Sequence, residues 1–223
     1  MLTWSFAFAA AAALLVEGVL LVGAVRSGDE TGPAELRGDG LLPPSALPSQ
    51  GMLVVGQIRA DGSVEVTQWI RSFDAITGLR LSEWSAPGAP RPTDLRLVAA
   101  DGTILADEGS GEVEPRGVRL DRPTSLVRAT YVLNGTTDES STKPGRRLVP
   151  AVSVGLESTP QAGPTFVQVR APVGGEVLSL ACDDARSPVD LLRPCGQPVG
   201  TGWQVRLSAD ARADRVAALV DLP

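Results

Sequence analysis

An apolar run at the amino terminus constrains this chain more than any other feature. It extends from Leu2 to Val25 and contains a single ionisable residue, Glu17. Without a polar face, the run does not suit a helix at the surface of a globular core. As an α-helix it would be about 36 Å long, which exceeds the roughly 30 Å of a bilayer's hydrocarbon interior. We therefore expect residues 1–25 to form a single-pass transmembrane anchor.

A cleaved signal peptide is the competing interpretation of the same run. Val22-Gly23-Ala24 resembles a small-residue cleavage site, although no basic region precedes the run and its apolar stretch is longer than that of a signal peptide. A helix buried in a core is the third interpretation. Because an N-terminal apolar segment is the usual export signal, we expect the carboxy-terminal part outside the cytoplasm. An uncleaved anchor would hold it at the cell membrane, whereas cleavage would release a secreted chain.

Glu17 lies close to the middle of the predicted membrane span. A carboxyl at that depth costs about 2.5–3.5 kcal/mol on insertion scales, and such residues generally mark a functional contact. Ala12, Ala13, Gly18 and Gly23 would allow a second helix to approach closely. Glu17 is therefore a candidate for an intramembrane contact with a partner protein. The alternative is a carboxyl that is merely protonated in lipid, or one carried by a signal peptide.

The composition excludes several classes of function. The chain has no histidine, so it cannot build a Ser-His-Asp triad, a Cys-His pair or a histidine-ligated metal site. A net charge of −6 and a pI near 4.8 argue against nucleic acid as a partner. No glycine-rich phosphate or dinucleotide motif is present, and we expect no cofactor and no metal. Lys143 is the only lysine, and this arginine bias is typical of GC-rich actinobacterial genomes.

The composition changes abruptly after the apolar run. Residues 26–50 are rich in glycine, proline and acidic residues and lack an apolar period, which predicts a flexible stalk. Short apolar runs separated by turn residues then continue to the end of the sequence. They predict an all-β, antiparallel β-sandwich ectodomain, as one large or two small sandwiches. We expect its first part at 51–133, a polar loop or linker at 134–147 and its second part at 148–223.

Two Asp-Gly pairs are the clearest local signals in this region. Asp61-Gly62 separates the runs at 52–58 and 63–70, and Asp101-Gly102 separates a second pair of runs, as in β-hairpins. The run at 125–133 is largely apolar on both faces, which predicts a central strand. Further strands are expected at 94–99, 102–106, 117–120, 148–156, 165–171, 176–182, 202–209 and 215–222.

Cys182 and Cys195 are the only cysteines. Exported chains generally pair their cysteines, and this pair would close a loop of about 14 residues, contributing about 3 kcal/mol. Asp183, Asp184 and Asp190 lie in the same loop. Their carboxylates suit calcium, but the Asp-x-Asp-x-Asp-Gly pattern is missing. An acidic, solvated turn is therefore the preferred interpretation.

The sequence does not single out the carboxylate pair that an enzymatic function would need in the absence of histidine. We therefore expect a non-enzymatic, membrane-anchored protein whose extracytoplasmic β-domain mediates interactions with envelope proteins or surface polymers. The alternative is an accessory single-pass subunit of a multi-protein membrane complex, in which Glu17 contacts a partner helix. Neither function can be assigned to particular residues of the β-domain from the sequence.

Overall fold

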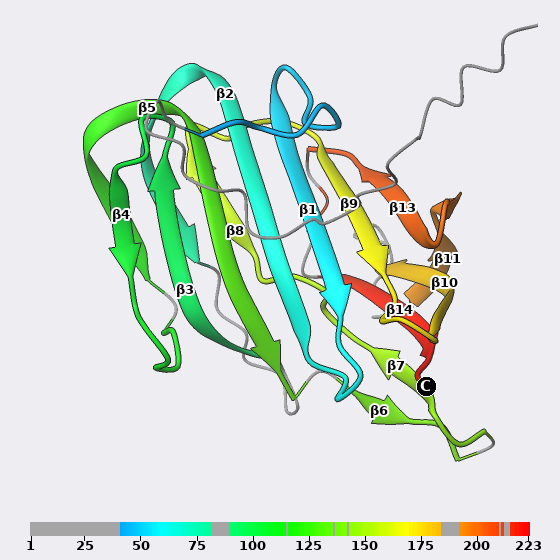
Figure 1. The fold of residues 1–223 in the computed structure, drawn as a ribbon. Helices are drawn as coiled ribbons and strands as arrows, with labels where there is room; N and C mark the ends of the chain where they lie inside the picture. The colour runs from blue at the N-terminus through cyan, green and yellow to red at the C-terminus, as the bar shows by residue number, and fades with distance from the viewer. Residues whose placement is uncertain are drawn as a thin grey trace, which may run out of the picture. The chain divides into compact units, whose positions relative to one another are not determined.

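The computed structural model describes residues 41–81, 90–114, 116–135, 137–141, 143–183, 192–209, 211 and 215–223. The chain divides into two units, residues 1–33 and 34–223, and the fold described here belongs to the second. Its regular structure is almost entirely β-strand, arranged in two open sheets (Figure 1). The described residues contain no helix long and apolar enough to cross a membrane. The predicted anchor at 1–25 and Glu17 lie outside them.

Sheet A is the larger of the two sheets, with nine strands among the described residues. Its order is β12-β13-β9-β1-β2-β5-β3-β4, and β8 pairs with the carboxy-terminal end of β2. The strands are β1 (Gly51–Ile58), β2 (Val64–Leu81), β3 (Arg91–Ala99), β4 (Ile104–Asp107), β5 (Gly117–Asn134), β8 (Leu156–Thr159), β9 (Thr165–Arg170), β12 (Gln197–Val199) and β13 (Gly202–Leu207).

Sheet B is smaller, and its order is β11-β10-β14-β7-β6. All of its pairs are antiparallel. The strands are β6 (Asp138–Glu139), β7 (Arg146–Val149), β10 (Glu176–Asp183), β11 (Leu192–Cys195) and β14 (Val216–Asp221). The segment predicted as a polar loop or linker, 134–147, begins at the last residue of β5 in sheet A and contains β6 and the first two residues of β7 in sheet B.

One hydrophobic cluster joins the two sheets. It contains Val54 and Ile70 of sheet A together with Leu180 and Ala218 of sheet B, all with at most 1% of their surface exposed. Trp203 of β13 adds a polar link, because its indole Nε1 donates a hydrogen bond to the carbonyl of Val177 in β10 over 2.7 Å. Both sheets therefore bury their inward side chains in a shared core.

The alternation of β2 explains why a polar residue lies inside this core. Val64, Val66, Gln68 and Ile70 are all fully buried, as their shared face predicts. The Gln68 carboxamide accepts a hydrogen bond from the Tyr131 hydroxyl at 3.1 Å and donates one to the Leu156 carbonyl at 3.4 Å. Its polar atoms are thus partnered, which removes most of the cost of burying them.

The strand predictions are confirmed at most positions. Both Asp-Gly turns join antiparallel hairpins, β1–β2 and β3–β4. The predicted central strand is the carboxy-terminal half of β5, which lies between β2 and β3. The run at 148–156 is an exception, because strand structure ends at Val149 and resumes at Leu156. Ala151 lies between them with a φ of 52°, a left-handed conformation that interrupts an extended strand.

Two further features differ from the expectation. Sheet A is not wholly antiparallel, because β1 pairs with β9 in parallel, with Met52 opposite Thr165. Residues 41–50, at the end of the predicted stalk, pack against sheet A, with Leu41 and Leu47 at 9% and 5% exposure. We call residues 41–50 the strap (Figure 1, blue).

Candidate binding face

Sheet A has a face directed away from the core that it shares with sheet B. Side chains alternate along a strand, and Val54, Val66 and Ala129 point into the core. The residues on either side of each of them therefore point outward. We call this surface the outer face, and the register of the strands aligns its residues into rows.

One row on the outer face consists mainly of amide and hydroxyl side chains. Directly paired residues continue it from β12 to β3 without a break. Except for the exposed Gln197, all its members are half-buried and thus in contact with solvent. We call it the amide–hydroxyl row, and it comprises Gln197, Gln204, Gln168, Val55, Thr67, Thr130 and Arg96.

The glutamines of this row are linked to each other. Gln168 of β9 donates its Nε2 to Oε1 of Gln204 in β13 over 3.2 Å. This contact uses one donor and one acceptor, and it leaves the carbonyl oxygen of Gln168 and the amide nitrogen of Gln204 for other partners. The pair is therefore held in place and still has hydrogen-bonding capacity.

A second row lies two residues along each strand on the same face. It comprises Arg206, Phe166, Leu53, Trp69, Arg128 and Val98, again in direct register. We call it the aromatic–arginine row. Two of its arginines stack on aromatic neighbours: Cζ of Arg128 lies 5.7 Å from the Trp69 ring centroid, and that of Arg206 lies 5.4 Å from the Phe166 centroid. Distances below about 6 Å are typical of a cation–π contact.

The strap covers the middle of the aromatic–arginine row. Leu41 and Leu47 pack with Leu53, Trp69 and Val98 in a cluster that is separate from the main core. Two hydrogen bonds fix the strap, from the Leu41 nitrogen to the Ala100 carbonyl and from the Arg71 guanidinium to the Pro48 carbonyl. The outer face therefore has a covered apolar part and an open polar part.

Arg128 is the arginine at the centre of the covered part, with 6% of its surface exposed. Burial lowers the pKa of its guanidinium, and the nearby positive charge of Arg96 lowers it as well. Arginine remains protonated at neutral pH despite such shifts. Arg206, at the β13 end of the same row, is exposed. The two stacked arginines thus differ in access to solvent.

The balance of charge on the outer face is positive. Around the two rows, its arginines are Arg71, Arg96, Arg128, Arg170 and Arg206, and its carboxylates are Glu65 and Asp107. Glu65 forms an ion pair with Arg59 at 3.1 Å, and Asp107 lies 3.8 Å from the Arg96 guanidinium. Among the described residues, no carboxylate forms an ion pair with Arg206.

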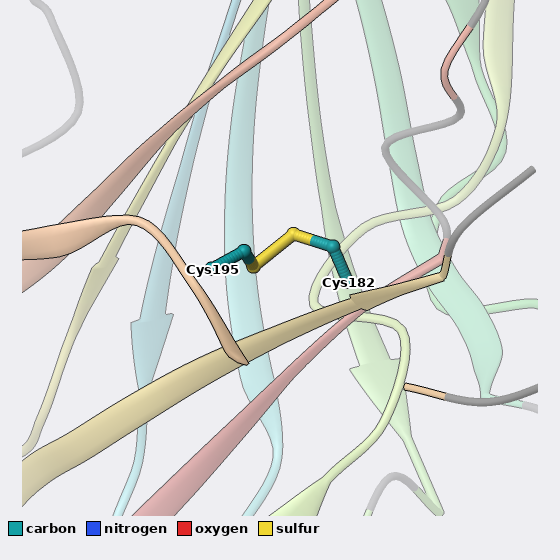
Figure 2. The surroundings of a disulfide bond; sticks show 2 residues. All are labelled: Cys182 and Cys195. Carbon is teal, nitrogen blue, oxygen red and sulfur yellow. A yellow bond between two sulfur atoms is a disulfide. The ribbon is translucent and has the colours of Figure 1, made fainter. Parts of the chain in front are cut away.

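Of the candidate site residues named from the sequence, the two cysteines and Asp183 fall within the described residues. Figure 2 shows the disulfide between Cys182 of β10 and Cys195 of β11, which joins neighbouring strands of sheet B. The bridge therefore lies away from the outer face of sheet A. Asp183 ends β10, whereas Asp184 and Asp190 lie outside the described residues. No three metal-ligating side chains gather anywhere in the described part of the chain.

The sequence predicts the components of the outer face but not their assembly. The alternation in 63–70 and 125–133 assigns Thr67 and Thr130 to strand faces opposite buried residues. The glutamines occur in similar settings, in the runs FVQVR and GWQVR. Their side-by-side placement depends on the pairing of β9 and β13 with each other and with β1. No local sequence signal specifies this pairing.

Comparisons with known proteins add no functional assignment. No family model matches the chain, and no curated protein matches it. Among solved structures it is similar to an aminopeptidase N family protein of Idiomarina loihiensis, with a TM-score of 0.45, 14% identity, and coverage of 75% of this chain and 29% of that one. An M1 zinc metallopeptidase of Deinococcus radiodurans gives a TM-score of 0.34, 10% identity and coverage of 77% and 41%. The chain spans less than half of either protein, and likeness at these scores carries no argument about its activity.

Proposed function

We propose that this protein is a membrane-anchored component of a bacterial cell envelope, with a β-sandwich domain outside the cytoplasm. It has a non-enzymatic role, in which the domain contacts envelope proteins or surface polymers. Residues 1–25 supply the anchor and the following residues connect it to the strap, where the described chain begins at Leu41. The apolar amino-terminal run and the absence of histidine from the sequence support this proposal.

The open part of the outer face is the observation that carries the proposal. The amide–hydroxyl row presents side chains that donate and accept hydrogen bonds across strands from β12 to β3. Neighbouring strands lie about 4.8 Å apart, so the row provides closely spaced contacts along an extended partner. A broad polar surface of this kind suits binding better than catalysis, which requires reacting groups held together in a cleft.

Photocrosslinking in living cells tests this proposal. A photoreactive residue at Thr67, on the open part of the outer face, should form adducts with an envelope polymer or an envelope protein. The matched control replaces Arg193, in β11 of sheet B, with the same photoreactive residue and should form few adducts. Absence of adducts from position 67, or equal yields from both positions, would contradict a binding role for this face.

The location is tested separately by topology. A reporter fused after Pro223 should be active only when it lies outside the cytoplasm. Activity confined to the cytoplasm would overturn the proposed orientation, whatever the crosslinking shows.

The second candidate function is that of an accessory subunit of a membrane complex. Glu17, within the apolar run, favours it, because a carboxyl in lipid gains most from a polar partner helix. A membrane protein should then co-purify in detergent at constant stoichiometry and be lost in the Glu17→Leu variant. Glu35→Leu removes a carboxyl outside the run and should leave the complex intact. Retention of the partner by Glu17→Leu would exclude this contact.

A further inference from the structure

We infer that the partner of the outer face is an acidic polysaccharide, that is, a glycan chain bearing carboxylate groups. This inference rests on the proposed function and specifies its ligand. Arg206 would bind a carboxylate of the glycan, and the amide–hydroxyl row would bind the hydroxyls of sugar units along the chain.

The stacking of Arg206 on Phe166 prepares it for a carboxylate. The two residues are directly opposite each other in β13 and β9, which places the guanidinium beside the ring at 5.4 Å. An arginine held by an aromatic surface loses less side-chain freedom on binding, and its planar donors match a carboxylate in a bidentate manner. Arg206 is exposed, so a ligand can reach these donors.

The amide–hydroxyl row begins next to this arginine. Gln204 lies two residues before Arg206 on the same face of β13, and it is linked to Gln168. Thr67 and Thr130 continue the row across β2 and β5. Amides and hydroxyls both donate and accept hydrogen bonds, as sugar hydroxyls do. The spacing between strands, about 4.8 Å, is comparable with the advance per sugar in an extended glycan.

Charge distinguishes an acidic glycan from a neutral one. The whole chain carries a net charge of −6, yet arginines outnumber carboxylates on the outer face, where Glu65 and Asp107 each lie beside an arginine. A positive surface on an acidic protein favours an anionic partner by complementarity. A neutral glycan would leave the prepared donors of Arg206 without a charged acceptor.

The strap argues for a glycan over an acidic protein. Protein interfaces obtain most of their binding energy from a few large apolar or aromatic anchors at their centre. Leu53 and Trp69, the large apolar side chains at the centre of the outer face, lie beneath the strap with 1% and 4% exposure. The open part of the face is therefore mainly polar, as expected for a surface that binds hydroxyls.

Calorimetric titration of the full-length chain in non-ionic detergent tests this inference with three probes. Alginate oligosaccharides carry carboxylates and hydroxyls, carboxyl-reduced alginate retains only the hydroxyls, and polyglutamate carries carboxylates without sugar. We expect alginate to bind, and each of the other two probes to bind at least about tenfold more weakly, because each lacks one of the two sets of contacts. Equal binding of polyglutamate would indicate charge alone, and equal binding of reduced alginate would exclude a role for the carboxylate. Either result overturns the inference.

Variants connect the binding to the outer face. Arg206→Gln should weaken alginate binding about tenfold and abolish the preference over reduced alginate. Phe166→Leu keeps the charge but removes the stacking surface, and it should weaken binding several-fold. Arg193→Gln makes the same charge change on sheet B and should have no effect. Unchanged binding by Arg206→Gln, in a variant that unfolds like the wild type, overturns the inference.

Failure of this inference is distinguishable from failure of the proposed function. If alginate does not bind but position 67 still crosslinks to an envelope protein, the acidic-glycan ligand is wrong and the binding face remains. If alginate does not bind and position 67 does not crosslink, both proposals fail.

Discussion

Single aspartates build the turns of the β1–β2 and β3–β4 hairpins of sheet A through the same contact. Oδ1 of Asp61 accepts hydrogen bonds from the Ser63 nitrogen at 2.9 Å and the Ser63 hydroxyl at 2.7 Å. Oδ1 of Asp101 likewise accepts the Thr103 nitrogen at 2.9 Å. The glycine that follows each aspartate has a positive φ, +85° at Gly62, which a side chain would oppose. These hydrogen bonds lower the pKa of both carboxyls.

Removal of this contact should destabilise the β1–β2 hairpin. We expect Asp61→Ala to lower the free energy of unfolding by about 1 kcal/mol, because two partnered donors on Ser63 lose their acceptor. Asp61→Asn keeps an acceptor oxygen and should retain most of that stability. Urea titration followed by circular dichroism measures both. An equal loss in the two variants would show that charge, and not the turn geometry, is what matters.

Asp221 connects stability to pH at the end of β14. Hydrogen bonds from Arg146 and then from Lys143 hold the pKa of its carboxyl well below the ordinary value of 3.8. An unfolded chain would therefore bind a proton at this group before the folded chain does. The contribution to stability is present above pH 3.8 and is lost as pH falls below it.

The Asp221→Asn variant should show this dependence directly. Compared with the wild type, its melting temperature should be lower at pH 7, and the difference should shrink as pH is lowered below about 4. Thermal melts across that range provide the measurement, and Asp138→Asn, in exposed β6, is the control. A difference that grows on acidification would have the wrong sign for this ion pair.

The strap depends on a small number of buried side chains. Leu47 has 5% of its surface exposed, whereas Leu42 in the same segment has 77%. We expect Leu47→Ala to cost about 2–4 kcal/mol of unfolding free energy, since the cavity lies against Trp69 and Leu53. Leu42→Ala should cost less than about 0.5 kcal/mol, as is usual for exposed positions. Denaturant titration with tryptophan fluorescence would detect both, and equal costs would refute the packing of the strap.

The strands that the sequence predicts correctly are those with a strong local signal. The alternation in 63–70 and the two-sided apolar run at 125–133 correspond to the first part of β2 and to the carboxy-terminal half of β5. Where that signal is weak, the elements differ. Between Arg71 and Ile76 the register of β2 shifts against β5, and Phe73 is 74% exposed there. A bulge of this kind depends on the partner strand, which the local sequence does not specify.

At the scale of the whole molecule, the disulfide supports sheet B. We expect the double variant Cys182→Ser/Cys195→Ser to lose about 3 kcal/mol of unfolding free energy, because the closed loop no longer restricts the unfolded chain. Reduction of the wild type should give a similar loss. Neither change should reduce binding by the outer face, since the bridge joins β10 to β11. Equal stability of oxidised and reduced protein would contradict this expectation.

The candidate site could be predicted from sequence only in part, because it is an assembly of distant strands. Thr67 and Thr130 follow from local alternation, but their neighbours Gln168 and Gln204 are contributed by strands much later in the chain. The strap was expected to belong to the stalk, because its prolines are typical of a flexible segment. The sequence does not show that two of its leucines pack on sheet A. Pairing and packing between distant segments are therefore what the sequence does not reveal.

The parallel pairing of β1 and β9 also determines the order in which the molecule can be completed. Gln57 in β1 donates a hydrogen bond to the Ala171 carbonyl, 114 residues later. During synthesis, β1 therefore has one edge without a neighbour until most of the chain has emerged. Long-range pairs of this kind slow folding and expose aggregation-prone edges. We therefore expect truncated chains that end before Thr165 to aggregate. The outer face can form completely only after β9 and β13 have been synthesised.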